Sequence, residues 1–252
     1  MVPKLATIDL SLAYGRVPAL AEVTSVFPEG LITALIGPSG GGKTSLLRCL
    51  NRMNDHLPGV RRRGRVLLDG EDIYRRGVDP ALIRRRVGMV FQRPNPFPLS
   101  VFANVAYGPR VHGITDRVRL RAIVERVLGE TGLWGELRGK LDRPALDLPL
   151  GQQQLLCLAR LLAVRPEVIL LDEPCSALDP EATRRLEDLV RRLVPSYTVI
   201  IVTHSLAQAA RLSDHTLFLL DGRLVEAGPT AQVFGAPGDR RTGDYLAGRL
   251  GA

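Results

Sequence analysis

Apolar residues along this chain fall into two patterns, short continuous runs and stripes with helical spacing. Four largely apolar runs are Leu31–Ile36, Val87–Phe91, Val168–Leu171 and Thr198–Val202. Runs of this length and composition are typical of strands in a parallel sheet that is covered on both faces. Elsewhere, apolar residues recur every three or four positions, as on the buried face of a helix. This alternation of strands and helices predicts an α/β core.

The helical stripes place the predicted helices between the strands. They run over Leu46–Met53, Leu120–Leu128, Leu155–Leu162 and Leu186–Leu193. Asp179-Pro180 supplies an N-cap and a first-turn proline for the last of these helices.

Further segments complete the predicted layout. After the first helix, a basic connection is expected to lead into a strand at Val66–Leu68. Ser100 and Thr115 are predicted N-caps in a helical insertion that spans residues 100–145. Short strands are expected at both ends of the chain, over Leu5–Leu10 and Val23–Phe27 and again over Leu217–Leu220 and Leu224–Ala227.

A glycine-rich segment joins the first apolar run to the first helix. It reads Gly37-Pro38-Ser39-Gly40-Gly41-Gly42-Lys43-Thr44. Glycines allow successive backbone N–H groups to point at an anion, and a helix start adds its positive dipole end. Lys43 is expected to reach the β- and γ-phosphates, and the Thr44 hydroxyl is expected to hold Mg²⁺. A plain turn between strand and helix is the alternative, but the full motif in register predicts a nucleoside triphosphate site.

Two acidic residues, Asp172 and Glu173, directly follow the apolar run Val168–Leu171. Ligands of open α/β sheets bind at the carboxyl ends of the strands. We therefore expect Asp172 to bind Mg²⁺ and Glu173 to orient and deprotonate the attacking water. The alternative is a solvated pair of acids at a strand end, which the upstream phosphate motif disfavours.

Three polar or aromatic side chains are weaker candidates for the same site. Gln92 follows a strand and is expected to touch the metal or the water, and His204 is expected to hydrogen-bond the γ-phosphate. Tyr14 precedes the glycine-rich segment, where its ring is placed to stack on adenine. Taken alone, a strand-end histidine or a single tyrosine is more often structural.

Composition narrows the possible classes of protein. The chain has 252 residues and a formal net charge of +8, with basic clusters at Arg61–Arg65 and Arg84–Arg86. Such charge is compatible with nucleic acid or an anionic membrane face, but only 5% of residues are aromatic and none are interleaved for base stacking. The longest apolar runs are too short to span a bilayer, and the first residues lack a secretion signal. Three cysteines without metal-ligand spacing (Cys49, Cys157 and Cys175) are expected to be reduced packing thiols in a cytoplasmic protein.

Taken together, these motifs resemble the ATP-binding subunits of ABC transporters, over nearly the whole chain. The matching positions are Tyr14, the phosphate loop, Gln92, Gly151–Gln154, Asp172-Glu173, Ser176–Asp179 and His204. Among that family the chain is most similar to the phosphate-importer members, on the segments Asn51–Asp55, Val90–Pro98, Asn104–Arg110, Gln152–Gln154 and Asp244–Arg249.

The resemblance implies an α/β P-loop NTPase fold of the ABC ATPase type. It comprises a RecA-like core with an N-terminal antiparallel β subdomain and an inserted α-helical subdomain. The whole chain, 1–252, would be one ATP-binding domain, with its core at about 1–92 and 164–252 and the helical subdomain at about 93–163.

It also implies an ATPase that uses ATP and Mg²⁺ and works as a dimer at the cytoplasmic face of the membrane. The partners would be a second ATPase subunit, two transmembrane permease subunits and, indirectly, an extracytoplasmic phosphate-binding protein; no nucleic acid is expected. Residues assigned to the nucleotide through the resemblance include Ser45, Gly151, Gln152 and Asp179, of which Asp179 would reach toward the other subunit. Phe97 and Leu99 would floor a groove for the membrane partners.

The chain departs from the family in its signature motif. The family reads Leu-Ser-Gly-Gly-Gln, whereas this chain has Leu148-Pro149-Leu150-Gly151-Gln152. Pro149 has neither hydroxyl nor N–H, and Leu150 adds bulk where close approach to phosphate favours glycine. Leu155 stands where the family usually has arginine, and Cys175 replaces a common threonine. We expect weak dimerisation or hydrolysis by the chain alone, or pairing with a second chain whose signature is intact.

Two other functions remain open from the sequence. The altered signature allows an ATP-binding regulatory subunit with little turnover. The positive charge allows a soluble ABC protein that acts on nucleic acid, which would bind DNA or RNA with a steep dependence on salt.

Overall fold

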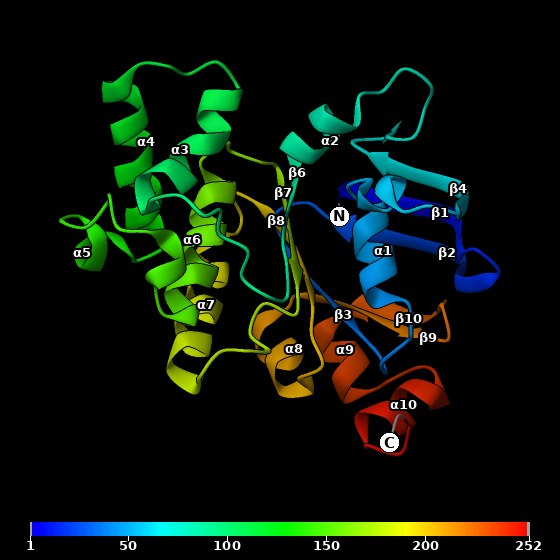
Figure 1. Cartoon of the computed structure of the whole chain (residues 1–252). Coiled ribbons are helices and arrows are strands. Elements are labelled where there is room, and N and C mark those ends of the chain that lie inside the picture. The colour runs from blue at the N-terminus through cyan, green and yellow to red at the C-terminus, as the bar shows by residue number, and fades with distance from the viewer. Residues whose placement is uncertain (1, 251–252) are drawn as a thin grey trace.

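The computed structural model describes residues 2–250, which form two sheets with helices packed against them (Figure 1). The antiparallel sheet has the strand order β2-β1-β4-β5, with β1 at Pro3–Tyr14, β2 at Val17–Pro28, β4 at Val60–Leu68 and β5 at Glu71–Asp72. The larger sheet has the order β10-β9-β3-β8-β7-β6. Its strands are β3 (Ile32–Ile36), β6 (Val87–Val90), β7 (Val168–Asp172), β8 (Thr198–Val202), β9 (His215–Leu220) and β10 (Arg223–Pro229).

The helices fall into three groups. Helix α1 (Lys43–Cys49) follows β3 and is succeeded by a 3₁₀ turn at Met53–His56, and α2 (Pro80–Arg86) precedes β6. The inserted group comprises α3 (Val101–Val111), α4 (Arg117–Glu130), α5 (Trp134–Leu137), a 3₁₀ turn at Ala145–Asp147 and α6 (Leu150–Leu162). The remaining helices are α7 (Pro180–Leu193), α8 (Leu206–Leu212), α9 (Thr230–Gly235) and α10 (Arg240–Leu246).

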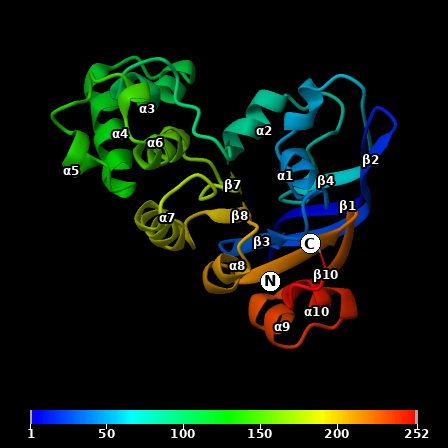
Figure 2. The same ribbon diagram turned by 60° about the horizontal axis from the view of Figure 1, so that its bottom comes forward.

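The larger sheet separates two hydrophobic clusters. Along β7, Val168 and Leu170 pack into the cluster beneath the antiparallel sheet and α1, whereas Ile169 and Leu171 pack into the cluster shared with the inserted helices. All five residues of β7 are buried, as are all five of β3 and of β8, which explains their continuous apolar sequences. Figure 2 shows α3, α4, α6 and α7 on one side of this sheet and α1 with the antiparallel sheet on the other.

The architecture confirms the predicted α/β fold with an antiparallel β subdomain and a helical insertion. The limits proposed for that insertion, residues 93 and 163, stay a prediction. Among residues 2–250 we find no helix with both the length and the apolar composition needed to cross a bilayer. The three cysteines are free, with Cys49 and Cys157 buried and Cys175 half-buried.

Three local predictions differ from the structure. Helix α1 ends at Cys49, short of Met53, and Arg52 takes the left-handed conformation with φ of 63°. The N-cap of α4 is Asp116 rather than Thr115, because the Asp116 carboxylate accepts the Val118 N–H.

The sequence predicts a basic connection followed by a strand at Val66–Leu68, but Arg61–Arg65 already belongs to that strand, β4. This stretch pairs with residues 8–13 of β1, and Arg61, Arg63 and Arg65 are exposed there. The pattern of apolar residues could reveal only the end of this strand, because Arg61, Arg63 and Arg65 face water.

A charged cluster ties the start of β1 to the loops that enter β6 and β7. Glu167 lies 2.5 Å from Arg86 Nε and 2.7 Å from the buried Lys4 Nζ. The hydrogen bond from Arg86, together with that from Lys4, lowers the pKa of Glu167 to about 2.

Because this pKa is lowered on folding, Glu167 stabilises the fold above its unfolded pKa, and that contribution disappears as the pH falls from about 4.5 toward 2. We expect the unfolding free energy of Glu167→Gln to fall less steeply than that of the unaltered chain as the pH is lowered over this range. Denaturant titrations at several pH values measure this slope. Glu181→Gln, at an exposed i,i+4 pair with Arg185, is the control and should keep the original slope. Parallel slopes in all three proteins would contradict this role of Glu167.

Candidate functional site

The glycine-rich segment forms a loop between β3 and α1 whose backbone excludes side chains. Gly37 has φ of 144°, and a Cβ atom there would lie 2.0 Å from the Leu219 carbonyl oxygen. Gly42 has φ of 94°, and a Cβ atom would lie 2.6 Å from the Ala19 carbonyl oxygen. The loop therefore requires glycine for both conformation and space, which is the backbone shape that points N–H groups at an anion.

Lys43 lies within this loop. Its ammonium group donates to the carbonyl oxygens of Gly37 at 2.9 Å and Pro38 at 2.8 Å, and the residue is 5% exposed. Burial lowers the pKa of Lys43, while the charges of Glu173 and Asp172 oppose that shift. A buried ammonium held only by neutral carbonyl groups fits an anionic ligand such as a phosphate.

Thr44 and Asp172 meet beside the loop although 128 positions separate them. The Thr44 hydroxyl donates to Asp172 Oδ1 at 2.9 Å, from the first turn of α1 to the end of β7. Burial raises the pKa of Asp172, and the hydrogen bond from Thr44 opposes that shift. One hydroxyl and one carboxylate are oxygen ligands of the kind that Mg²⁺ takes in triphosphate sites, so the residues fit this ion.

Glu173 is held between Gln92 and His204, two of the weaker candidates from the sequence. Gln92 Nε2 donates to Glu173 Oε2 at 3.1 Å, and His204 Nε2 lies 2.6 Å from Glu173 Oε1. Glu173 itself has φ of 46°, a conformation that is strained for a side-chain-bearing residue and recurs at functional sites. A cavity of about 320 Å³ lined by Glu173, Thr203 and His204, among others, adjoins this carboxylate and leaves room for water.

Tyr14 is fixed by a residue that the sequence did not single out for a role. The Tyr14 hydroxyl lies 3.2 Å from Ser45 Oγ and donates to Asn54 Oδ1 at 3.0 Å. Asn54 is 1% exposed and donates in turn to the Ser45 carbonyl oxygen and to Cys49 Sγ. The segment Asn51–Asp55 was singled out only because it resembles phosphate importers. Nothing in one sequence predicts that the Asn54 side chain reaches Tyr14 at the end of β1.

The altered signature lies at the start of α6. Pro149 is the N-cap with φ of −53°, and Leu150, the first residue of the helix, is 53% exposed. The Gln153 side chain donates to the carbonyl oxygens of Leu146 and Leu148, which steadies the chain that enters the helix. Helix formation is therefore undisturbed, as expected for a proline at this end. What is missing from this helix start is a hydroxyl and one N–H group.

Other residues assigned through the resemblance have contacts within the chain. Gln152 donates to Glu136 at 2.6 Å, and Arg185 also binds Glu136 at 3.2 Å. Leu155 is 7% exposed beside Arg185, in a cavity of about 330 Å³. Asp179 is exposed and caps α7 by accepting the Ala182 N–H at 2.8 Å. Their contacts with a nucleotide remain predictions, as does that of Gly151.

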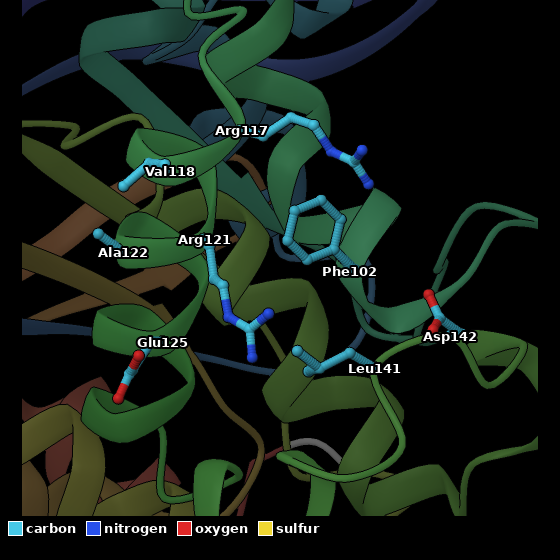
Figure 3. A pocket seen from close by; sticks show the side chains of 8 residues that line it. All are labelled: Phe102, Arg117, Val118, Arg121, Ala122, Glu125, Leu141 and Asp142. Carbon is cyan, nitrogen blue, oxygen red and sulfur yellow. The ribbon is translucent and has the colours of Figure 1, made fainter.

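A separate cavity of about 580 Å³ lies in the helical insertion (Figure 3). Arg117 and Arg121 of α4 extend on the side where the Phe102 ring lies, and Leu141 and Asp142 close another side. None of its lining residues belongs to the phosphate loop or contacts Glu173, so this cavity is distinct from the candidate site.

The fold and this site define a P-loop nucleotide-binding protein. The phosphate loop, the Thr44–Asp172 contact and the Glu173 cluster all lie at the carboxyl ends of β3, β6, β7 and β8. A family model described as ABC transporter matches residues 20–176. The chain belongs to this family, and it is an ABC transporter ATP-binding subunit.

Solved structures agree with this assignment. The structure of cbiO1 from Clostridium perfringens, described as part of the ABC transporter complex cbiONQ, is 27% identical and has a TM-score of 0.81, covering 99% of this chain and 98% of that one. A bacterial Atm1-family ABC exporter with ATP bound is 26% identical and has a TM-score of 0.82. That match covers 99% of this chain and 42% of the exporter chain. One match is part of a transporter complex and the other is an exporter, so the likeness establishes the ATPase fold and not the transported substrate.

Proposed function

We propose that this chain binds and hydrolyses ATP to drive the uptake of inorganic phosphate through partner membrane subunits. The observation that carries the hydrolytic part is the Glu173 carboxylate, held by Gln92 and His204 at the end of β7 and beside a cavity. A carboxylate placed at that position is suited to accept the proton of a water molecule that attacks the γ-phosphorus. The products are ADP and inorganic phosphate.

The remaining residues of the site bind and orient the triphosphate in this proposal. The N–H groups of Gly40–Thr44 and the Lys43 ammonium hold the phosphate oxygens, and Tyr14 stacks on adenine. His204 hydrogen-bonds the γ-phosphate and keeps Glu173 in place. Mg²⁺, bound by Thr44 and Asp172 with Gln92 nearby, would neutralise charge on the β- and γ-phosphates. Gly151, Gln152 and Asp179 would act across a dimer on the nucleotide of the second subunit.

An apolar surface beside the Gln92 segment supports the membrane partnership. Leu99 is 42% exposed, and the Phe97 ring lies 4.7 Å from that of Tyr107, which is 47% exposed. Arg160 covers the other part of this surface, with its guanidinium 4.3 Å from the Phe97 ring. We propose that a cytoplasmic helix of one permease subunit docks on this surface. Such docking would hold the chain at the cytoplasmic face of the membrane.

Phosphate as the transported ion is supported by the segments that resemble phosphate importers. The test is transport by the complex that co-purifies with this chain from its native cell, reconstituted in proteoliposomes with an extracytoplasmic binding protein. We expect ATP-dependent accumulation of radiolabelled phosphate and none of sulfate. ATP-driven accumulation of another solute without phosphate would refute the phosphate assignment and leave the ATPase assignment standing.

The altered signature favours a second function, an ATP-binding regulatory subunit with little turnover. Pro149 and Leu150 remove a hydroxyl and an N–H group and add a branched side chain at the helix start. Single-turnover hydrolysis by the purified chain separates the two functions. Stoichiometric release of phosphate within minutes supports the motor, whereas bound ATP that stays intact for hours supports the regulator.

Asn54 provides a test of the adenine side of the site. We expect Asn54→Ala to weaken Mg-ATP binding about threefold to tenfold, because Tyr14 loses a hydrogen-bond acceptor that orients its ring. Asn51→Ala is the matched control, since Asn51 is a buried asparagine whose side chain, within residues 2–250, bonds only the neighbouring Met53 N–H. Equilibrium binding of Mg-ATP to both variants is the measurement, and equal affinities would contradict this role of Asn54.

A further inference from the structure

Segments from the last third of the chain contact the phosphate loop. The turn between β9 and β10 contacts the loop through the hydrogen bond from Gly222 N–H to the Gly41 carbonyl oxygen, 3.2 Å long. A Cβ atom on Gly222 would lie 2.7 Å from the Ala19 carbonyl oxygen, so β2 presses on the same turn. The loop is thus backed by chain that lies beyond the family match, which ends at residue 176.

Helix α10 adds a direct hydrogen bond to the first residue of the loop. The Gly37 N–H donates to the Tyr245 hydroxyl oxygen at 3.2 Å, across 208 positions of sequence. Tyr245 is 9% exposed, and burial raises the pKa of its hydroxyl. In Figure 1 the blue loop between β3 and α1 descends toward the red helix α10.

The position of Tyr245 is itself well determined. Its ring is stacked on that of Phe218, with centroids 4.8 Å apart and an angle of 17° between the planes. Phe218 lies on β9 opposite Ile36, the residue that immediately precedes Gly37. At the start of α10, Glu226 of β10 accepts the N–H groups of Gly238 and Asp239. The helix is therefore tied to the same strands that carry the loop.

We propose that α10 is a latch on the phosphate loop and that Tyr245 is its positioning residue, setting the Gly37 peptide plane for phosphate binding. Gly37 lacks the steric restraint of a side chain, so its peptide can rotate unless a partner holds the N–H group. A buried N–H also needs an acceptor, and the Tyr245 hydroxyl oxygen is the acceptor of the Gly37 N–H. The proposal rests on the nucleotide-binding function of the loop only for its effect on affinity, because the latch itself exists without nucleotide.

The first test needs no nucleotide. Tyr245→Phe keeps the ring and its stacking on Phe218 but deletes the acceptor for the Gly37 N–H. Tyr74→Phe is the matched control, since it deletes another tyrosine hydroxyl bonded to backbone, here the Cys49 carbonyl oxygen at 3.0 Å. In hydrogen–deuterium exchange of the purified full-length chain, we expect peptides covering residues 36–42 to exchange about threefold to tenfold faster in Tyr245→Phe and unchanged in Tyr74→Phe. Unchanged exchange in Tyr245→Phe would overturn the latch, whether or not the protein binds nucleotide.

The second test measures the consequence for binding, with Mg-ADP as the probe. We expect Tyr245→Phe to raise the dissociation constant about threefold to tenfold and to leave single-turnover hydrolysis at saturating ATP unchanged, whereas Tyr74→Phe keeps the original affinity. Equal affinities of Tyr245→Phe and Tyr74→Phe would show that Tyr245 is only structural. Absence of Mg-ADP binding by the unaltered chain would instead refute the proposed function and leave the exchange result to decide on the latch.

Discussion

The Glu173→Gln variant is expected to hydrolyse Mg-ATP about 10²- to 10⁴-fold more slowly than the unaltered chain, with little change in Mg-ATP affinity. The amide has almost the shape of the carboxylate and can still contact Gln92 and His204, but it cannot accept a proton from water. Among the residues that the structure describes, the Glu173 side chain bonds Gln92 and His204 and no residue of the phosphate loop, so the binding site is left intact. The measurement pairs single-turnover hydrolysis with equilibrium binding of Mg-ATP.

The control for this variant is Glu181→Gln, the same chemical change on α7 at an exposed carboxylate that pairs with Arg185. It should keep both rate and affinity. Because the altered signature is expected to slow ATP hydrolysis, both variants are best measured a second time in a chain whose signature has been restored. A Glu173→Gln chain that turns over as fast as the Glu181→Gln chain would remove Glu173 from the chemistry.

Restoring the signature with Pro149→Ser and Leu150→Gly together is expected to raise the ATPase rate about 10²- to 10³-fold. The double variant returns a hydroxyl and an N–H group to the start of α6 and removes the 53% exposed Leu150 side chain. In the proposed homodimer each signature would face the nucleotide of the other subunit, so both composite sites would gain these donors. Leu146→Gly, at a nearby leucine that is 54% exposed, controls for the loss of exposed apolar surface alone.

The same experiment separates the two explanations of the altered signature. If the chain works as a homodimer with weak turnover, the double variant should be faster and the Leu146→Gly variant should not. If it works with a second chain that carries an intact signature, that chain should co-purify from the native cell. An unchanged or lower rate in the double variant, with a pure homodimer that turns over normally, would contradict the inference that the signature is impaired.

Much of the core was predictable because the buried strands are apolar on both faces. The apolar run Thr198–Val202 became β8 with the same limits, and Val168–Leu171 became β7 with one more residue. Such runs report burial directly. By contrast, only the end of β4, Val66–Leu68, was predicted as a strand. Its first part was interpreted as a basic connection, since the arginines there are solvated and their strand character comes from pairing with β1. Helix α2 was missed for a related reason, as only Ile83 among its seven residues is buried.

The candidate site shows the same division between local and long-range information. The loop Gly37–Thr44 and the pair Asp172-Glu173 were predictable because their chemistry is written in adjacent residues. The structure brings Thr44 to Asp172 and places Gln92 and His204 around Glu173, while their roles toward nucleotide, metal and water stay predictions. Asn54 and Tyr245 could not have been assigned their contacts, because each acts through a side chain that meets a distant segment only after folding.

The whole interpretation depends on Mg-ATP binding through Lys43 and its loop, and thermal unfolding tests it most directly. With Mg-ATP at about 100 times its dissociation constant, the unaltered chain should gain about 2.7 kcal/mol and unfold about 5–10 °C higher. Lys140→Met, at an exposed lysine, should keep this shift, and Lys43→Met should lose it. No shift in the unaltered chain, or equal shifts in all three proteins, would contradict a nucleotide site at this loop.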